Sequence, residues 1–549
     1  MKKNQKFTAE ISGCTSQGLG VARIEGRAVF VKGAIPGESC EILIEKVNNT
    51  AAYGKLLRVI QASTHRIAPC CPNFGICGGC DFLHMDYSME IAIKKQRVED
   101  AMRRIGGFEI EDISILPAEN PYGYRNKVQF PVSVANGRFE AGFYRARSHT
   151  LIPVENCCIQ FPQAAGIART IIAWMRKYNI RPYDEATGEG YIRHLYFRQA
   201  KNTGQIMVCL VVNSDELPKT RQLIDTLNTL HPQISTVLLN INKEQGNVIL
   251  GNTFEVLCGS GKIVDKLCGL EFEISAASFY QVNHDQTEKL YQIAVKNAML
   301  SGTETLLDLY CGIGTISLVM SRYAARVIGI EIIPDAVRNA SNNAKRNGIS
   351  NTEFLCEDAG AAAKRFAEQG IHPDVIMLDP PRKGIMASTV DAICRMAPSR
   401  IVYISCNPAT LSRDLHNLCQ KGYKLSSCQA ADLFPRCKHV ETVALLTRKL
   451  SNAKSIVVEI DTDTLKAEKK PPMATYANMR KWIREELGLK VSAANIAAMK
   501  DELGLEKQFS YEKAGMAAEK RPGIPEEKRQ AIIKAFGHFG LIKPEKDKA

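Results

Sequence analysis

The sequence predicts a multidomain α/β protein with a small amino-terminal β-barrel, a mixed α/β middle region, a parallel-sheet half and a helical extension. Its 549 residues exceed what one hydrophobic core supports. Residues 7–61 alternate with period two between glycine turns, whereas buried strands that end in polar residues recur over 305–405. After residue 450 the composition changes to charged residues and then to helical periodicity. These observations set the expected segments at 1–61, 62–274, 275–450, 451–474 and 475–549.

Composition limits the classes of protein that the chain can represent. Hydrophobic residues make up 45%, and Lys+Arg of 71 against Asp+Glu of 58 gives a net charge of +13. A polyanion partner is compatible with this excess, although the charge alone decides nothing. The 18 cysteines lack the dense spacing of a secreted scaffold, so we expect a reducing cytoplasm. No apolar run approaches the roughly 18 residues of a membrane span, so we expect no membrane contact.

The first segment, residues 1–61, is expected to form an OB-like barrel. Short strands at this spacing, with glycines at the corners, are typical of such barrels. Barrels of this type commonly bind single-stranded RNA, and basic residues recur along the segment. A barrel used only for packing is the alternative.

A cysteine cluster follows in the sequence CCPNFGICGGC at residues 70–80. Cys71, Cys77 and Cys80 have the spacing C-x5-C-x2-C, and a fourth thiolate is available in the doublet Cys157-Cys158. Four thiolates suit either a structural zinc ion or a [4Fe–4S] cluster, and spacing alone does not separate them. Free buried thiols are the third possibility.

The rest of the middle region predicts a basic helix and an RNA-facing segment. Residues 88–106 have helical periodicity and end at Gly106-Gly107. Within residues 122–149, Arg125 and Lys127 interleave with tyrosines, a pattern that suits phosphates and unstacked bases. A solvated basic face is the competing interpretation. Residues 165–260 alternate between helical and strand patterns without an evident catalytic group.

The parallel-sheet half opens with a nucleotide-type loop. The strand TLLDLY ends near Asp308 and runs into CGIGT, where Gly312 and Gly314 let the backbone approach a ligand. The next strand ends in Glu331, 19 residues after Gly312, at the position that binds ribose hydroxyls. The loop lacks a Walker lysine and the third glycine of the dinucleotide fingerprint, which favours an adenosyl cofactor without a pyrophosphate. Asp358, at the end of EFLCED, is a candidate for the adenine edge.

Three further motifs carry the expected chemistry. DVIMLDPPR places Asp379 at a strand end, with prolines that frame the rim of the site. IVYISCNPAT places Cys406 at the carboxyl end of a buried strand, where a thiol is a candidate nucleophile rather than a packing residue. DLFPRCKHVETVALL places Glu441 immediately before the closing strand.

Residues 451–474, with Pro471-Pro472, are expected to be a linker. Residues 475–549 predict three helices, with Gly488 and Gly504 as caps. No catalytic constellation occurs in this extension, which is compatible with RNA or protein binding.

The motifs together resemble the iron–sulfur-containing RNA uracil-5-methyltransferases, in the branch that acts on bacterial 23S ribosomal RNA. The resemblance covers residues 7–449 and rests on the barrel, the cysteines, FxQxN (Phe279, Gln281, Asn283), DLYCGxG, DPPR, SCNP and HxE. It implies a TRAM domain, a Rossmann-like class I methyltransferase domain, and a helix at 88–106 that packs with the catalytic domain. Residues 451–549 lie outside it.

The resemblance also implies cofactors and residue roles. It favours a [4Fe–4S] cluster over zinc, held by Cys71, Cys77, Cys80 and Cys157 in preference to Cys70 and Cys158. It implies binding of S-adenosyl-L-methionine by Gln281, Asp308, Tyr310, Gly312, Gly314, Glu331, Asp358 and Asp379. It implies that the uracil and its RNA are bound by Phe279, Gln281, Asp379, Arg125 and Lys127. Gln281 could equally line the cofactor cleft.

The expected chemistry follows from the weak nucleophilicity of carbon 5 of uracil. A thiolate, Cys406, must first add to carbon 6, and a base, Glu441, must later remove the proton from carbon 5. We therefore expect a monomeric enzyme that methylates a uridine of ribosomal RNA and binds no DNA. The alternatives are a tRNA T-loop uracil-5-methyltransferase and a non-catalytic RNA-binding assembly factor. The latter would be expected to have lost Cys406 or Glu441. Cytosine methylation is disfavoured because those enzymes place the nucleophile in other motifs.

Overall fold

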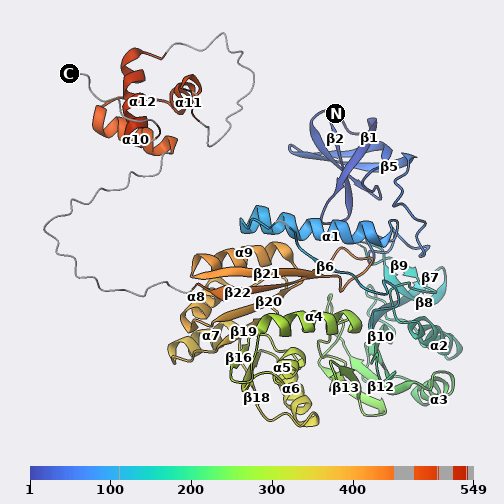
Figure 1. Cartoon of the computed structure of the whole chain (residues 1–549). Helices are drawn as coiled ribbons and strands as arrows, with labels where there is room; N and C mark the ends of the chain where they lie inside the picture. Colours follow the sequence, from blue (N-terminus) through green and yellow to red (C-terminus); the bar gives the residue numbers. More distant parts are fainter. Residues whose placement is uncertain are drawn as a thin grey trace. The chain divides into compact units, whose positions relative to one another are not determined.

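The computed structural model describes residues 1–110, 112–146, 148–449, 475–503, 505, 524–539 and 541. The chain divides into two compact units, Met1–Ser451 and Asn452–Ala549 (Figure 1). The linker expected at 451–474 lies outside the described residues.

The amino-terminal strands close into a barrel, which confirms the small barrel expected from the alternating sequence. Its interior is filled by the inward-facing members of each alternation, including Ile11, Val29 and Ile42, all of which are buried. The strands follow the order β1-β2-β3-β5-β4 and span Lys6–Cys14 (β1), Leu19–Ile24 (β2), Arg27–Lys32 (β3), Ser39–Val47 (β4) and Ala51–Gln61 (β5).

The middle region is built on a seven-stranded sheet in the order β13-β12-β11-β10-β7-β8-β9. Two amphipathic helices, α2 and α3, pack their apolar stripes against it, with Ile171 and Leu223 fully buried in the same core. The elements are β7 (Lys127–Ala135), β8 (Arg138–Tyr144), β9 (Leu151–Pro153), α2 (Gln163–Lys177), β10 (Ile192–Gln199), β11 (Ile206–Val212), α3 (Thr220–Leu230), β12 (Ile234–Ile241) and β13 (Thr253–Cys258).

The carboxy-terminal half of this unit is an eight-stranded sheet in the order β18-β17-β16-β19-β20-β22-β21-β6. The first five strands are parallel, β22 is antiparallel to both β20 and β21, and β6 pairs with β21 in parallel. The strands are β6 (Ile115–Leu116), β16 (Thr305–Asp308), β17 (Arg326–Glu331), β18 (Thr352–Cys356), β19 (Val375–Leu378), β20 (Arg400–Ser405), β21 (Tyr423–Ala431) and β22 (Glu441–Arg448).

Helices cover both faces of this sheet, as near-continuous apolar parallel strands require. On one face of the sheet, Leu306 and the strand residues that point the same way pack in a core shared with α4, α5 and α6. On the other face, Leu307 and the strand residues that point with it pack in a core shared with α1, α7, α8 and α9. The helices are α1 (Tyr87–Ala101), α4 (His284–Ala298), α5 (Thr315–Met320), α6 (Pro334–Arg346), α7 (Ala359–Glu368), α8 (Ala387–Met396) and α9 (Pro408–Gln420).

The structure differs from the sequence expectation in three places. The helix expected at 88–106 is α-helical only to Ala101 and continues as one π-helical turn, Met102–Gly106. Strand β6 joins the carboxy-terminal sheet although it falls within the segment 62–274. The hairpin of β14 (Lys262–Leu267) and β15 (Leu270–Ser275) also packs there, since Asn343 in α6 and Asn347 directly after this helix accept hydrogen bonds from the hairpin backbone. Short apolar segments carry no signal of which core they join.

In the described part of the second unit there are three helices, α10 (Tyr476–Leu487), α11 (Ala493–Glu502) and α12 (Glu526–His538). Met479, Ile483, Ile496 and Phe536 are buried in their shared core. Gly488 ends α10 in the left-handed conformation, with φ of 67°, as the sequence predicts. Gly504 lies outside the described residues.

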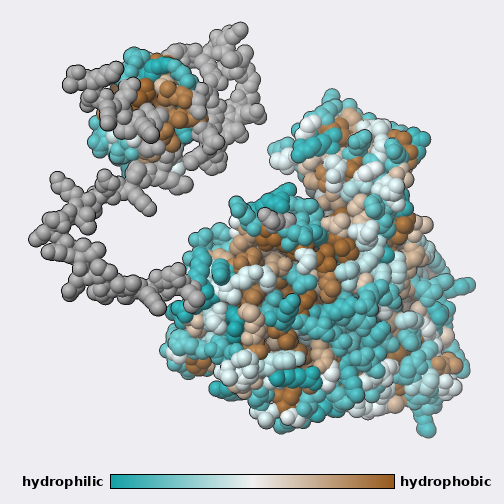
Figure 2. All heavy atoms as spheres, in the orientation of Figure 1, coloured by the Kyte–Doolittle hydropathy of each residue, from teal (hydrophilic) through white to brown (hydrophobic). Residues whose placement is uncertain are grey.

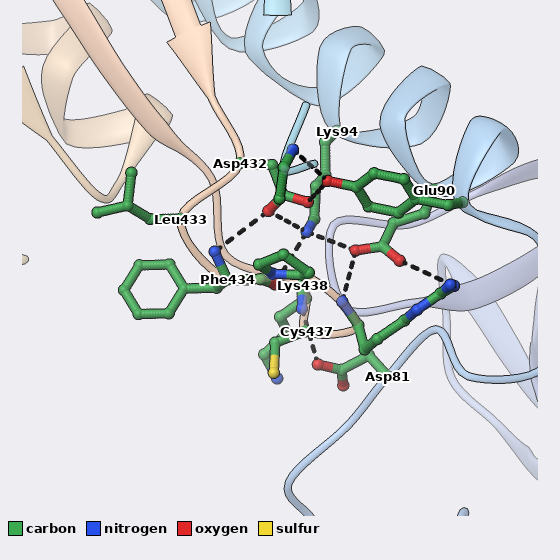
Figure 3. A network of polar contacts seen from close by, with 12 residues as sticks. Asp81, Glu90, Lys94, Asp432, Leu433, Phe434, Cys437 and Lys438 are labelled. Carbon is green, nitrogen blue, oxygen red and sulfur yellow. Dashed lines mark hydrogen bonds and ion pairs between the residues drawn. The ribbon is translucent and has the colours of Figure 1, made fainter. Parts of the chain in front are cut away.

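A buried ion network ties α1 to the segment between β21 and β22 (Figure 3). Lys94 is 1% exposed, and its Nζ donates to Glu90 Oε1 and Asp432 Oδ1, both at 2.7 Å, and to the Phe434 carbonyl at 3.0 Å. Both carboxylates are fully buried. Removing one member of such a network leaves uncompensated charge in a low-dielectric interior.

We predict that Lys94→Met lowers the free energy of unfolding by about 3–5 kcal/mol, because it strands two buried carboxylates. Lys95→Met is the matched control: this neighbouring lysine is partly exposed and pairs with Asp112 at the surface, so its loss should cost less than about 1 kcal/mol. Urea unfolding of the full chain, followed by circular dichroism, measures both. Equal unfolding midpoints for the two variants would contradict the prediction.

Candidate active site

The chemistry-bearing residues collect at one edge of the eight-stranded sheet. Strands β16, β17, β19 and β20 are parallel, so the residues at their carboxyl ends meet at that edge. Strand β22 runs in the opposite direction, and Ser405 pairs with Thr442. The next residues along the two strands are Cys406 and Glu441, so this register brings the expected nucleophile and base together. The neighbouring switch point between β16 and β19 is where open α/β sheets bind ligands.

Cys406 lies on a turn that two other motifs hold in place. Asn407 caps α9 by accepting from Ala409 N, and its Nδ2 donates to the Arg382 carbonyl at 3.1 Å. Thr410 Oγ1 donates to the same carbonyl at 3.2 Å. The DPPR loop and the SCNP loop are therefore locked to each other, with the thiol between them.

Burial and charge set the protonation states of this cluster. Burial, followed by the nearby Glu441 carboxyl, raises the pKa of Cys406, whereas the Arg382 guanidinium lowers it. Glu441 is 4% exposed, and burial together with Asp379 raises its pKa well above the usual range. Burial, and then Asp308, raises the pKa of Asp379 to about 7. The carboxyl pair therefore retains a proton near neutral pH, as closely spaced buried carboxyls do.

The loop after β16 approaches its neighbours closely. Gly312 and Gly314 have positive φ of 55° and 82°, and a Cβ on Gly314 would lie 3.1 Å from the Ala340 side chain. Glu331 accepts from Gly312 N at 3.1 Å and from Ile333 N at 3.0 Å, so it ties this loop to the end of β17.

Asp308 lies behind the loop that follows β16. It is fully buried, and its two oxygens accept from Tyr310 N at 3.2 Å and Ser317 Oγ at 2.5 Å. Burial raises the pKa of Asp308 to about 6, while the Ser317 hydroxyl lowers it. Asp308 therefore fixes the loop from behind, and its expected contact with the cofactor stays a prediction.

The segment between β15 and α4 faces the same edge. Phe279 is 65% exposed, which is unusual for a phenylalanine in a packed domain. Gln281 is half-buried and its carbonyl accepts from Asn126 Nδ2, while Asn283 caps α4 and donates to the Leu433 carbonyl.

Three further residues of the predicted site, Asp358, Arg125 and Lys127, lie on neighbouring segments. Asp358 is exposed and caps α7 by accepting from Gly360 N and Ala361 N through one oxygen. Arg125 forms an isolated bridge with Asn283 and is thereby brought beside the FxQxN segment. Lys127 is half-buried, and burial, followed by Arg198 and Arg125, lowers its pKa to about 8.

Two tyrosines of the 122–149 segment contact the connection between β21 and β22, and the interpretation of the segment as a platform for bases stays a prediction. Tyr124 donates its hydroxyl to the Pro435 carbonyl at 2.9 Å. The Arg436 guanidinium stacks over the Tyr122 ring at 4.8 Å from its centroid. Arg147, the last arginine of the expected basic segment, lies outside the described residues.

Four cysteines surround one small cavity of about 30 Å³: Cys71, Cys77, Cys80 and Cys157. Cys70 and Cys158 do not line it, and their sulfur atoms lie 2.7 Å apart. Burial, and then the Cys71 and Cys77 thiols, raise the pKa of Cys157. Among the described residues, no group of three or more His, Cys, Asp or Glu side chains is arranged to hold a metal ion.

Two features were not assigned from the sequence. Arg382 was noted only as part of DPPR, yet it is the cation that acts on Cys406 and Glu441, and its guanidinium lies 3.4 Å from His439 Nε2. A cavity of about 480 Å³ lies between the barrel and α1 and reaches Pro408 and Ala409, beside the nucleophile. Figure 2 shows apolar surface gathered along the lower side of α1 on the visible face.

No helix among the described residues is long and apolar enough to cross a membrane.

The solved structure of Pyrococcus abyssi tRNA (uracil-54, C5)-methyltransferase in complex with S-adenosyl-L-homocysteine shares this fold. Its TM-score is 0.65 at 22% identity, and the match covers 80% of this chain and 100% of that one.

Sequence comparisons agree with the fold. An RNA methyltransferase of Clostridium acetobutylicum is 43% identical over 451 residues, covering 82% of this chain and 98% of its own length. One from Halalkalibacterium halodurans is 40% identical over 452 residues, with the same coverage. Both are described as uncharacterized. The TRAM domain model matches residues 2–57, and the tRNA (uracil-5-)-methyltransferase model matches residues 87–449. The chain therefore belongs to the tRNA (uracil-5-)-methyltransferase family of RNA methyltransferases and carries an amino-terminal TRAM domain.

Proposed function

We propose that this enzyme transfers a methyl group from S-adenosylmethionine to carbon 5 of a uridine in 23S ribosomal RNA through a covalent Cys406–uracil adduct. The observation that carries this proposal is the register of β20 and β22. The Ser405–Thr442 pair makes Cys406 and Glu441 neighbours at the ligand-binding edge of the sheet. A thiol, a basic carboxylate and a cation, Arg382, are the groups that the reaction needs in one place.

The chemistry assigns Cys406 and Glu441 to successive steps. The Cys406 thiolate bonds to carbon 6 of uracil, and the electron pair of the 5,6 double bond moves to oxygen 4 as an enolate. S-adenosylmethionine, when bound, supplies the electrophilic methyl group that carbon 5 can then accept. Glu441 removes the remaining proton from carbon 5, and the electrons of that bond restore the double bond and expel Cys406 as thiolate.

We assign each residue at this edge of the sheet either to the cofactor or to the uracil and its RNA. We assign the backbone of Gly312 and Gly314 and the carboxylate of Glu331 to the adenosyl group, together with Tyr310 and the free oxygen of Asp358. Phe279, 65% exposed, is available to stack on an extruded uracil. Gln281 and Asp379 are assigned to its polar edge, and Arg125 and Lys127 to the adjacent phosphates.

We further propose that Cys71, Cys77, Cys80 and Cys157 hold a [4Fe–4S] cluster. The support is that these four thiols, and not Cys70 or Cys158, line one cavity. Because burial raises the pKa of Cys157, a cationic group would provide the charge that stabilises the thiolates. The cluster would supply structural cross-linking of residues 71–80 to 157.

Ribosomal RNA is proposed because the cysteines and the barrel together resemble the ribosomal branch. The names of the family and of the Pyrococcus enzyme, which both refer to tRNA, support tRNA as the second candidate. Mapping ribothymidine in both RNA classes from a deletion strain separates them. Loss of the modification from tRNA alone would exclude the ribosomal substrate.

The adduct is tested with 5-fluorouracil-substituted RNA, since fluorine at carbon 5 cannot be removed as a proton. The wild-type enzyme and cofactor should give a shifted band on a denaturing gel. Cys406→Ala should give no band and no product, and Glu441→Gln should lower the rate on ordinary RNA by about 10²–10⁴-fold and accumulate adduct. A shifted band with Cys406→Ala would refute the mechanism.

The raised pKa values predict the direction of the pH dependence. Cys406 and the Glu441–Asp379 pair must lose protons to act, and the pKa of Asp379 is about 7. Single-turnover methyl transfer should therefore accelerate as the pH rises through 7 and should decline below it. RNA binding measured at each pH separates this effect from affinity. A rate that falls with rising pH across this range would contradict the assignment.

Adjacent cysteines provide matched variants for the cluster. Anaerobically purified protein should contain about four irons and four sulfides per chain. Cys71→Ser and Cys157→Ser should lose them, whereas Cys70→Ser and Cys158→Ser should retain them, because only the first pair lines the cavity. A zinc-only preparation, or equal loss in neighbouring variants, would refute the assignment.

A further inference from the structure

The segment 432–440, which connects β21 to β22, ends immediately before Glu441. Contacts from other parts of the chain hold each residue from Asp432 to Lys438. Glu90 accepts from Arg436 N at 2.7 Å, Tyr124 donates to the Pro435 carbonyl, and Lys94 donates to the Phe434 carbonyl. Such dense external support is unusual for a connection between adjacent strands, which normally runs over the surface.

Part of this support comes from the cysteine loop, residues 70–80, and from the two residues that follow it. Asp81 N and Phe82 N donate to the Arg436 carbonyl at 2.9 and 3.1 Å, and Cys437 Sγ donates to the Gly79 carbonyl at 3.1 Å. Asp81 Oδ2 accepts from Lys438 N at 2.9 Å. Gly79 and Asp81 flank Cys80, so a proposed cluster ligand lies at the centre of these contacts.

Arg436 shows that the segment is constrained. Its φ of 67° is left-handed, a conformation that a non-glycine residue keeps only when its surroundings impose it. The side chain is buried, and Nη1 donates to the Met85 carbonyl at 3.1 Å. The backbone on both sides of Arg436 is held by Glu90 and by the residues around Cys80, as the network in Figure 3 shows for Glu90, Asp81 and Lys438.

Glu441 depends on this segment for its position. Only His439 and Val440 separate it from Lys438, and no hydrogen bond among the described residues orients its carboxyl group. The pairing of Ser405 with Thr442 sets Glu441 next to Cys406, and the contacts of residues 432–438 anchor the chain that leads into Glu441. The turn that carries Cys406 has additional contacts of its own, from Asn407 and Thr410 to the Arg382 carbonyl. The contacts of the cysteine loop therefore act on the Glu441 side of the site.

We propose that Asp81 and Cys437 are positioning residues that couple the cysteine loop to the general base, so that the loop controls resolution of the RNA adduct and not its formation. This inference rests on the proposed function and deepens it. The cysteine loop then has a catalytic consequence although it touches neither reacting atom. Its effect falls on the step that Glu441 performs, because the contacts end three residues before that side chain.

The test measures the covalent adduct on ordinary uridine RNA, in the full chain. Asp81→Ala removes the acceptor for Lys438 N, and Asp86→Ala is the matched control, since Asp86 accepts from Met89 N as the cap of α1 and has no contact with the segment. With Asp81→Ala we expect adduct to accumulate and turnover to fall about 10–100-fold, the scale of a misplacement of about 1 Å. Cofactor binding and Cys406 alkylation should match the wild type, and Asp86→Ala should accumulate no adduct.

Cys437 provides a second variant, which tests the other side-chain contact between the cysteine loop and the segment. Cys437→Ala removes the donor to the Gly79 carbonyl and should accumulate adduct, whereas Cys437→Ser retains a donor and should restore resolution. Iron content, measured in every variant, should remain at the wild-type level, which separates positioning from loss of a cluster.

The outcomes distinguish the two proposals. If Glu441→Gln accumulates no adduct, the assignment of the base fails, whatever Asp81→Ala does. If Glu441→Gln accumulates adduct while Asp81→Ala and Cys437→Ala resolve it at the wild-type rate, the coupling is refuted. Equal accumulation in Asp81→Ala and Asp86→Ala would mean a general loss of stability and would also refute it.

Discussion

The antiparallel pairing of β20 with β22 is the constraint on which the site depends. Five parallel strands bring the cofactor loop, Glu331, Asp379 and Cys406 to one edge. All five strands end at this edge, so none of them can contribute a residue from its beginning. The reversed β22 begins at this edge, and Ser405 opposite Thr442 fixes its register. A shift of one residue would turn Glu441 to the other face of the sheet, because side chains alternate along a strand. The apolar residues of β22, buried on both faces, make that shift costly.

Burial gives this edge its chemical character. In water, the carboxyl groups of Asp308, Asp379 and Glu441 would keep their ordinary protonation states. The same holds for the Cys406 thiol and the Arg382 guanidinium. Instead, burial at this edge raises the pKa of Asp379, Glu441 and Cys406, while the Arg382 guanidinium lowers the pKa of both Glu441 and Cys406. A carboxylate with a raised pKa is a stronger base, which suits a group that must take a proton from carbon. Asp308, one layer deeper, raises the pKa of Asp379 while it anchors the cofactor loop.

Buried polar groups also hold the cysteine loop and α1 in place. Lys94, Glu90 and Asp432 are charged and almost fully buried, so each is tolerated only because the others are present. Such networks specify one arrangement and permit few others. Here the arrangement joins segments more than 330 residues apart in sequence. The connection before Glu441 is consequently held as firmly as a strand.

The sequence by itself determined the closed barrel, the series of parallel strands, and the placement of Gly312, Glu331, Asp379 and Cys406 at strand ends, because period, glycine turns and prolines are local signals. It did not reveal that Asp308 is buried behind the cofactor loop, that Tyr122 and Tyr124 contact the segment 432–440, or that Arg382 acts on Cys406. Nor did it reveal that Lys94 is buried: beside Lys95 in a basic helix it has the pattern of a solvated face. Only the tertiary structure decided these points, since burial and partnership arise from segments distant in sequence. The resemblance favours Cys71 and Cys157 over their neighbours, and the tertiary structure shows that these two line the cavity. Adjacent residues in a turn point in different directions, and only the fold determines which direction is the interior.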